Sequence, residues 1–156
     1  MRAVLIFLTT FAALASPNLA ADKGLPKGFK LSYEHDAGMV PLREKLVIYS
    51  GKGSYTAFEK GKNYTVKLGK KQQDRVLELY NDLKRLGVFQ LKIKNNAPQK
   101  PRPPIADGGY KNLILSYKGF YLSLSEQGIS KISKKDQQTV RAAFKLLANF
   151  TQHYRQ

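Results

Sequence analysis

Side chains suited to acid–base or metal chemistry are scarce in this sequence. It contains two histidines, His35 and His153, and no cysteine. It has no HExxH zinc motif, no GxSxG nucleophile motif and no glycine-rich phosphate loop. The one compact cluster of titratable groups is Glu34-His35-Asp36. Because neighbouring strand residues point to opposite faces, these three side chains do not easily converge on a metal ion. The sequence therefore predicts a protein without catalytic residues, metal or cofactor, and a small hydrolase is the alternative.

Positive charge is the feature of the composition that calls for a partner. Lys and Arg number 27 against 11 Asp and Glu, a formal net charge of +16. Such a field attracts polyanions through long-range electrostatics and counterion release. The alternative is that the charge only keeps the protein in solution. The candidate binding residues are the basic side chains before the central helix and those in a proline-rich segment, namely Lys60, Lys62, Lys67, Lys70, Lys71, Lys94, Lys100, Pro101 and Arg102.

Four strands are predicted before the centre of the chain. Phe29, Leu31 and Tyr33 alternate with polar residues, which is the period of a half-buried strand. Further alternating runs cover about 44–50, 54–59 and 63–68. Gly51-Lys52-Gly53 and Lys60-Gly61 supply the turns between them. Strands joined by such short turns favour an antiparallel meander.

The most periodic stretch is the central one, from Lys71 to Ile93. Val76, Leu79, Tyr80, Leu83 and Leu86 recur at helical spacing, and Gly87 suits the left-handed residue that ends a helix. The apolar run 88–93 that follows is typical of a strand. The sequence therefore predicts an amphipathic helix that leads directly into a strand.

The second half repeats strands followed by a helix. Four prolines lie within 98–104, which favours an extended, solvated loop over 95–109. Alternating strands at 110–117 and 120–126 flank the turn Lys118-Gly119. Ser133 and Asp136 have capping-box spacing and begin a last helix with an apolar stripe at Val140, Phe144, Leu147 and Phe150. We therefore expect one α+β domain, a mostly antiparallel sheet packed on two helices in the order β-β-β-β-α-β-β-β-α.

The N-terminus has the pattern of a secretory signal peptide over 1–21, with Arg2 before an apolar run and small residues before Asp22. Its removal would leave a net charge of +15. We expect 22–28 to be a flexible lead-in and 29–152 to be the single domain. No other apolar run is long enough to span a membrane. The sequence thus predicts a periplasmic or secreted bacterial protein, without disulfides or a lipid anchor.

Several of these features together resemble a known family. They are VLELYNDLKRLGVFQL, the proline-rich gap, DGGYKNLILSY with its glycine turn into FYLSLSE, and the closing amphipathic helix. This arrangement is similar to the emfourin-like family of small bacterial inhibitors of thermolysin-type metallopeptidases. The resemblance covers about residues 29–150 and implies the same α+β layout and an inhibitory function.

Two functions follow from these observations. The first is an exported protein-binding module, such as an inhibitor of a secreted protease, that inserts loop 38–43 or loop 95–109 into a partner protein. The second is a basic protein that binds an anionic envelope component, such as lipopolysaccharide or anionic lipid, or nucleic acid. The sequence names neither the partner nor the oligomeric state.

Overall fold

A computed structural model of the chain describes residues 24–39, 42–50, 52–93 and 109–155. They form one six-stranded sheet and two α-helices, which confirms the α+β prediction. The elements are β1 (Lys30–Asp36), β2 (Leu42–Tyr49), β3 (Lys52–Glu59), β4 (Lys62–Leu68), α1 (Gln73–Arg85), β5 (Tyr110–Tyr117), β6 (Phe120–Ser125) and α2 (Lys134–Gln152).

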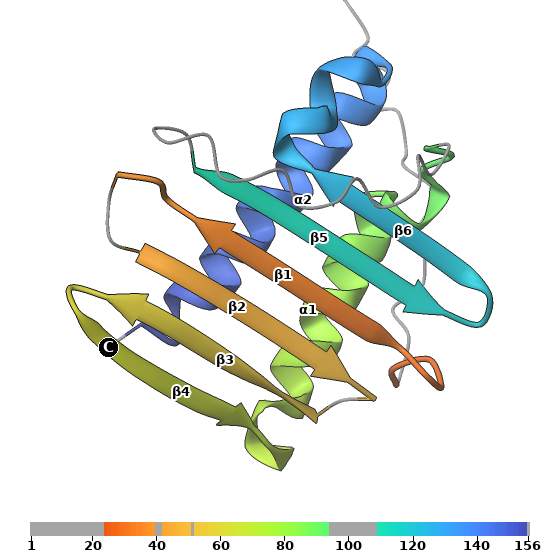
Figure 1. Ribbon diagram of the computed structural model, residues 1–156. Helices are drawn as coiled ribbons and strands as arrows, with labels where there is room; N and C mark the ends of the chain where they lie inside the picture. The colour runs from red at the N-terminus through yellow and green to blue at the C-terminus, as the bar shows by residue number, and fades with distance from the viewer. Residues whose placement is uncertain (1–23, 40–41, 51, 94–108, 156) are drawn as a thin grey trace, which may run out of the picture.

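The strands lie in the order β4-β3-β2-β1-β5-β6, and every neighbouring pair is antiparallel. Strand β1 is therefore central, with the first meander on one side and the β5–β6 hairpin on the other (Figure 1). Two hairpins use the predicted turns, Lys60-Gly61 and Lys118-Gly119. All four of these residues have positive φ, as two-residue turns between twisted strands require.

Both helices pack on the same face of the sheet, and in Figure 1 both lie behind it. The core between the sheet and the helices is aliphatic and aromatic, because alternate strand residues point toward the apolar stripes of α1 and α2. Its largest fully buried members include Tyr33, Tyr55, Phe29, Leu31, Leu46, Ile48, Leu83, Leu113, Leu115, Leu122 and Leu147. Among the described residues, no helix or strand covers the opposite face of the sheet, which we call the uncovered face.

The segment after α1 corrects one sequence-based prediction. Helix α1 buries Val76, Leu79, Tyr80 and Leu83 of its predicted stripe, whereas Leu86 follows the helix and is half-buried. Gly87 has the expected left-handed φ of 78°. The predicted strand 88–93 is wrong, because Val88–Gln90 forms a 3₁₀ turn instead. In a strand, Val88 and Phe89 would point to opposite faces. The turn directs both toward the core, where Phe89 contacts Tyr80, Tyr117 and Phe120 at ring-centroid distances of 5.3, 5.4 and 5.6 Å.

Helix α2 begins as predicted. The hydroxyl of Ser133 accepts a hydrogen bond from the backbone N–H of Asp136 at 3.1 Å. Val140, Phe144 and Leu147 are buried, whereas Phe150 is half-buried and Thr151 is buried in the last turn. The chain continues in contact with the domain beyond the helix, because Tyr154 is buried and Arg155 is half-buried against the sheet.

Several predictions fall outside the described residues. They include the signal peptide 1–21, almost all of the proline-rich loop 95–109, and the candidate residues Lys94, Lys100, Pro101 and Arg102. Loop 38–43 is described only at its ends. Within the described residues, no helix is long and apolar enough to cross a membrane.

Candidate functional site

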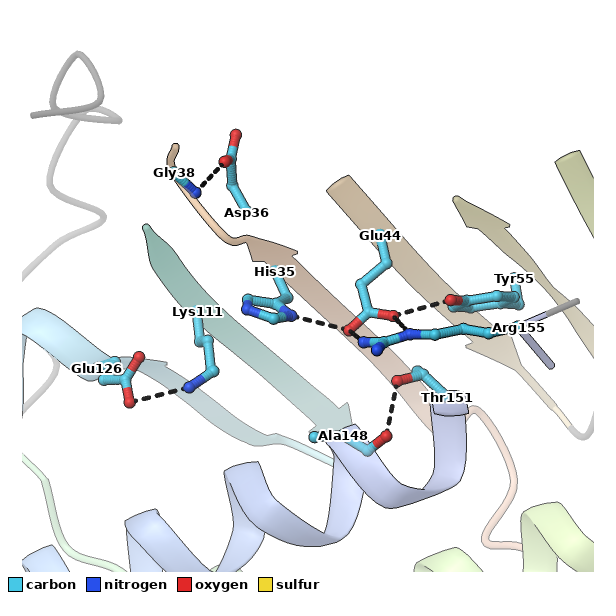
Figure 2. Close-up of polar contacts among 10 residues, drawn as sticks. All are labelled: His35, Asp36, Gly38, Glu44, Tyr55, Lys111, Glu126, Ala148, Thr151 and Arg155. Carbon is cyan, nitrogen blue, oxygen red and sulfur yellow. Dashed lines mark hydrogen bonds and ion pairs between the residues drawn. The ribbon is translucent and has the colours of Figure 1, made fainter. Parts of the chain in front are cut away.

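The cluster Glu34-His35-Asp36 divides between the two faces of the sheet. On the uncovered face, Lys45 Nζ lies 2.7 Å from a Glu34 carboxylate oxygen, and Arg43 Nε lies 2.9 Å from one of Asp36. His35 points to the helix-covered face instead (Figure 2). Within the described part of the chain, no group of three or more His, Cys, Asp or Glu side chains is placed to hold a metal ion.

A buried carboxylate, Glu44 of β2, is the centre of a polar network on the helix-covered face (Figure 2). The Glu44 side chain has no exposed area. Its Oε1 lies 2.9 Å from His35 Nδ1 and accepts a hydrogen bond from a terminal guanidinium nitrogen of Arg155 at 2.9 Å. Its Oε2 accepts from the Tyr55 hydroxyl at 2.8 Å and from Arg155 Nε at 3.2 Å. The network thus joins β1, β2 and β3 to the end of the chain.

These contacts set the ionisation of the network. Burial alone would raise the pKa of Glu44, but the hydrogen bonds from His35, Arg155 and Tyr55 outweigh burial and lower that pKa from 4.5 to about 2. Burial and the hydrogen bond to Glu44 raise the pKa of Tyr55. Although burial opposes it, the contact with Glu44 raises the pKa of Arg155. Near neutral pH the network therefore holds a carboxylate, a phenol and a guanidinium.

Glu44 has a structural role, because protein groups occupy both of its carboxylate oxygens. Each of its oxygens already has two partners. A general base needs an oxygen within reach of a substrate proton, whereas here both oxygens are engaged by protein groups. This arrangement fastens the C-terminal residues across the sheet and fixes the end of α2.

Sequence reasoning missed both members of this ion pair. The sequence predicts only that Glu44 begins a strand, and the predicted domain, 29–152, ends before Arg155. One signal was present, because Glu44 occupies an inward position in the alternating series Leu42, Glu44, Leu46, Ile48. A charged residue at a core position implies a buried partner. The sequence did not show which of the many basic residues that partner is.

The uncovered face carries a different set of side chains, arranged in rows by the strand register. The row at the end of β2 crosses five strands, because Tyr49 pairs with Lys52 and Lys30, Lys30 with Ser116, and Ser116 with Tyr121. We call it the basic row; it consists of Lys52, Tyr49, Lys30, Ser116 and Tyr121. The next row consists of Lys67, Ser54, Val47, Ser32, Ile114 and Ser123.

The charges on the uncovered face are unevenly distributed. The two rows just described contain Lys30, Lys52 and Lys67 and no carboxylate, and no ion pair to these lysines occurs among the described residues. The other two rows contain Glu34 and Asp36, each paired with a cation. One half of the face is therefore cationic, and the other half is neutralised by ion pairs.

Tyr49 is the most exposed aromatic side chain of the cationic half. Tyr49 is 55 % exposed, and Lys30 Nζ lies 5.1 Å from the ring centroid, within the range of a cation–π contact. Lys30 comes from β1. On the β3 side, Tyr49 lines an open hollow of about 510 Å³ together with Val47, Ser50, Lys52, Gly53 and Ser54. Tyr121 and Ile114 add exposed apolar surface on β6 and β5.

The predicted lysines do not form one patch. All of Lys60, Lys62, Lys67, Lys70 and Lys71 are exposed. Lys60 and Lys62 lie at one end of the edge strand β4, and Lys67, Lys70 and Lys71 lie at or beyond its other end. Of the five, Lys67 points to the uncovered face, opposite Ser54. The structure places it in the row next to that of two lysines that sequence reasoning did not select, Lys30 and Lys52.

Comparison of the chain with models of known protein families finds no family that matches, and comparison with curated proteins finds no match either. The resemblance to the emfourin-like family thus stays a prediction made from the sequence.

Proposed function

We propose that this protein is an exported, non-enzymatic binding protein, and that it binds an anionic polymer through the cationic half of its uncovered sheet face. The observation that carries this proposal is the position of Lys30, Lys52 and Lys67 on neighbouring rows that contain no carboxylate. Three cations on one regular surface bind a chain of negative charges more strongly than the same cations scattered, because one polymer contacts all three and each contact releases counterions condensed on that polymer.

The buried network supports the non-enzymatic part of the proposal. Within the described part of the chain, Glu44 is a buried carboxylate with a strongly lowered pKa, and its hydrogen bonds are all made within the protein. Strongly shifted pKa values also occur in structural ion-pair networks. Glu44 fits this structural case, because Arg155 and Tyr55 hold it in place.

A protein-binding module that inhibits a secreted protease is the competing function. It would work through loop 38–43 or loop 95–109, and these two loops contain most of the residues outside the described part of the domain. The two functions differ in salt dependence. Binding by exposed lysines weakens steeply with rising salt concentration, because salt screens the attraction between charges and makes counterion release less favourable. Insertion of a loop into a partner's cleft depends much less on salt.

Heparin provides the test, as a polyanion without aromatic rings. Binding to the mature protein would be measured by calorimetry at about 50 and 200 mM salt. The variant Lys30→Glu/Lys52→Glu/Lys67→Glu should bind at least roughly tenfold more weakly. Its control, Lys134→Glu/Lys135→Glu/Lys145→Glu, changes the net charge equally on exposed positions of α2 and should lose much less. Equal losses in both variants would contradict a defined binding face.

A further inference from the structure

The lysines of the cationic half explain attraction to any polyanion, but the aromatic rings between them are more selective. Tyr49 stands between Lys52 and Lys30 in the basic row, and Tyr121 ends the row on β6. These two residues are 55 % and 46 % exposed. A sulfated or carboxylated sugar chain would use the lysines and has no aromatic ring to stack on the tyrosines. A chain with both charge and flat rings would use both.

We infer that the anionic polymer is a single-stranded nucleic acid, an inference that rests on the proposed function. Its phosphates contact Lys30, Lys52 and Lys67, and its bases stack on Tyr49 and Tyr121. Aromatic side chains on an open sheet or groove, flanked by cations, provide this kind of recognition, and base stacking tolerates any sequence.

The surroundings of Tyr49 fit a stacked base. Lys30 from β1 lies over the ring, and the hollow of about 510 Å³ lies on the β3 side. Its lining combines the apolar Val47 with the hydroxyls of Ser50 and Ser54, and Lys52 lies beside it. Pockets of a few hundred Å³ accommodate small planar ligands. A base in the hollow would contact the ring on one side, and its phosphate would lie near Lys52.

The spacing of the row fits more than one nucleotide. Tyr49 and Tyr121 lie on strands three positions apart, which corresponds to roughly 14 Å at the usual strand separation. Lys30 and Ser116 lie between them in the row and offer a cation and a hydroxyl to the backbone of the ligand. In a duplex the bases are stacked inside and do not reach a sheet surface, so the geometry favours a single strand.

The probes are a fluorescently labelled oligonucleotide of twelve deoxythymidines, a DNA duplex of twelve base pairs, and heparin. The affinity for each is measured by anisotropy or calorimetry at one fixed salt concentration. The oligonucleotide should bind more tightly than the duplex. Tyr49→Ala should weaken oligonucleotide binding by about tenfold or more and leave heparin binding within about twofold. Tyr49→Phe keeps the ring and should bind as the natural protein does.

Tyr110→Ala is the matched control. Tyr110 also lies on the uncovered face, but it is in register with Asp36 in the neutralised half. The Tyr110→Ala variant should therefore bind the oligonucleotide with the same affinity as the natural protein. Equal binding of duplex and single strand, or an equal effect of Tyr49→Ala on oligonucleotide and heparin, would overturn the inference. In those cases the proposed function would stand if heparin binding still required the three lysines. Failure to bind either polymer would overturn both.

Discussion

Arg155 and Glu44 are 111 residues apart in the sequence, yet two guanidinium nitrogens of Arg155 contact the two carboxylate oxygens of Glu44, at 2.9 and 3.2 Å. The acid belongs to β2 and is buried; the arginine follows the last helix and is 28 % exposed. Such a two-point contact fixes direction as well as distance. It holds the end of the chain against the helix-covered face of the sheet.

Arg155→Ala should lower the free energy of unfolding by about 2–3 kcal/mol. It removes two charge-assisted hydrogen bonds and leaves a buried carboxylate with only His35 and Tyr55 as partners. Urea denaturation would measure the change. Arg85→Ala is the control, because its ion pair with Asp82 on α1 is exposed and should contribute less than about 0.5 kcal/mol. Similar losses in the two variants would show that the network does not anchor the chain.

The stability of the protein should fall in acid because of Glu44. Its pKa is lowered from 4.5 to about 2 in the folded state, so the unfolded state binds a proton at higher pH than the folded state does. The resulting stabilisation is complete above about pH 5 and is lost as the pH falls toward 2. Its size is about 3 kcal/mol. Urea denaturation between pH 2 and 7 should show this loss, and Glu44→Gln should make the profile flatter over the same range. An unchanged profile would contradict the role assigned to Glu44.

Ser133→Ala should destabilise the protein by about 1 kcal/mol. The Ser133 hydroxyl accepts a hydrogen bond from the backbone N–H of Asp136, which has no partner within α2 because it lies in the first turn. Thermal unfolding followed by circular dichroism would measure the change. Ser130→Ala, at an exposed position before the helix, is the control and should have little effect. Equal shifts would mean that the cap does not stabilise α2.

Gly53→Ala should destabilise the protein by about 2 kcal/mol or more. A Cβ at this position would lie 2.1 Å from the backbone oxygen of Val47, so β2 and β3 would have to move apart. Gly128→Ala is the control, because its added Cβ would have no atom within 4 Å. Chemical denaturation of both variants tests this prediction, and a neutral Gly53→Ala would contradict the close approach of the two strands.

The salt dependence of oligonucleotide binding should count the lysines that contact phosphate. With three contacts, the logarithm of the association constant should fall with the logarithm of salt concentration at a slope of about −2. Lys52→Gln should reduce the magnitude of that slope by about 0.7, whereas Lys145→Gln on α2 should leave it unchanged. A slope that does not respond to Lys52→Gln would remove this lysine from the binding face.

Most of the secondary structure was predictable because it depends on local patterns. The alternation around Leu31 and Tyr33 and the helical stripe from Val76 to Leu83 each appear where predicted. The strand predicted at 88–93 is wrong because packing against the core overrides the local preference of these residues. Its residues Val88 and Phe89 have strand-forming side chains, but the core needs both on one side, and a 3₁₀ turn supplies that arrangement.

The sequence by itself determined the α+β class, the turns at Lys60-Gly61 and Lys118-Gly119, and the cap at Ser133, because periodicity, positive φ and capping act over a few residues. Only the tertiary structure decided that β1 lies between β2 and β5, that Arg155 is the partner of Glu44, and that Lys30, Lys52 and Lys67 share a face. These relationships join residues far apart in the chain. Strand order and register set them, and no local pattern of residues encodes which distant strands become neighbours.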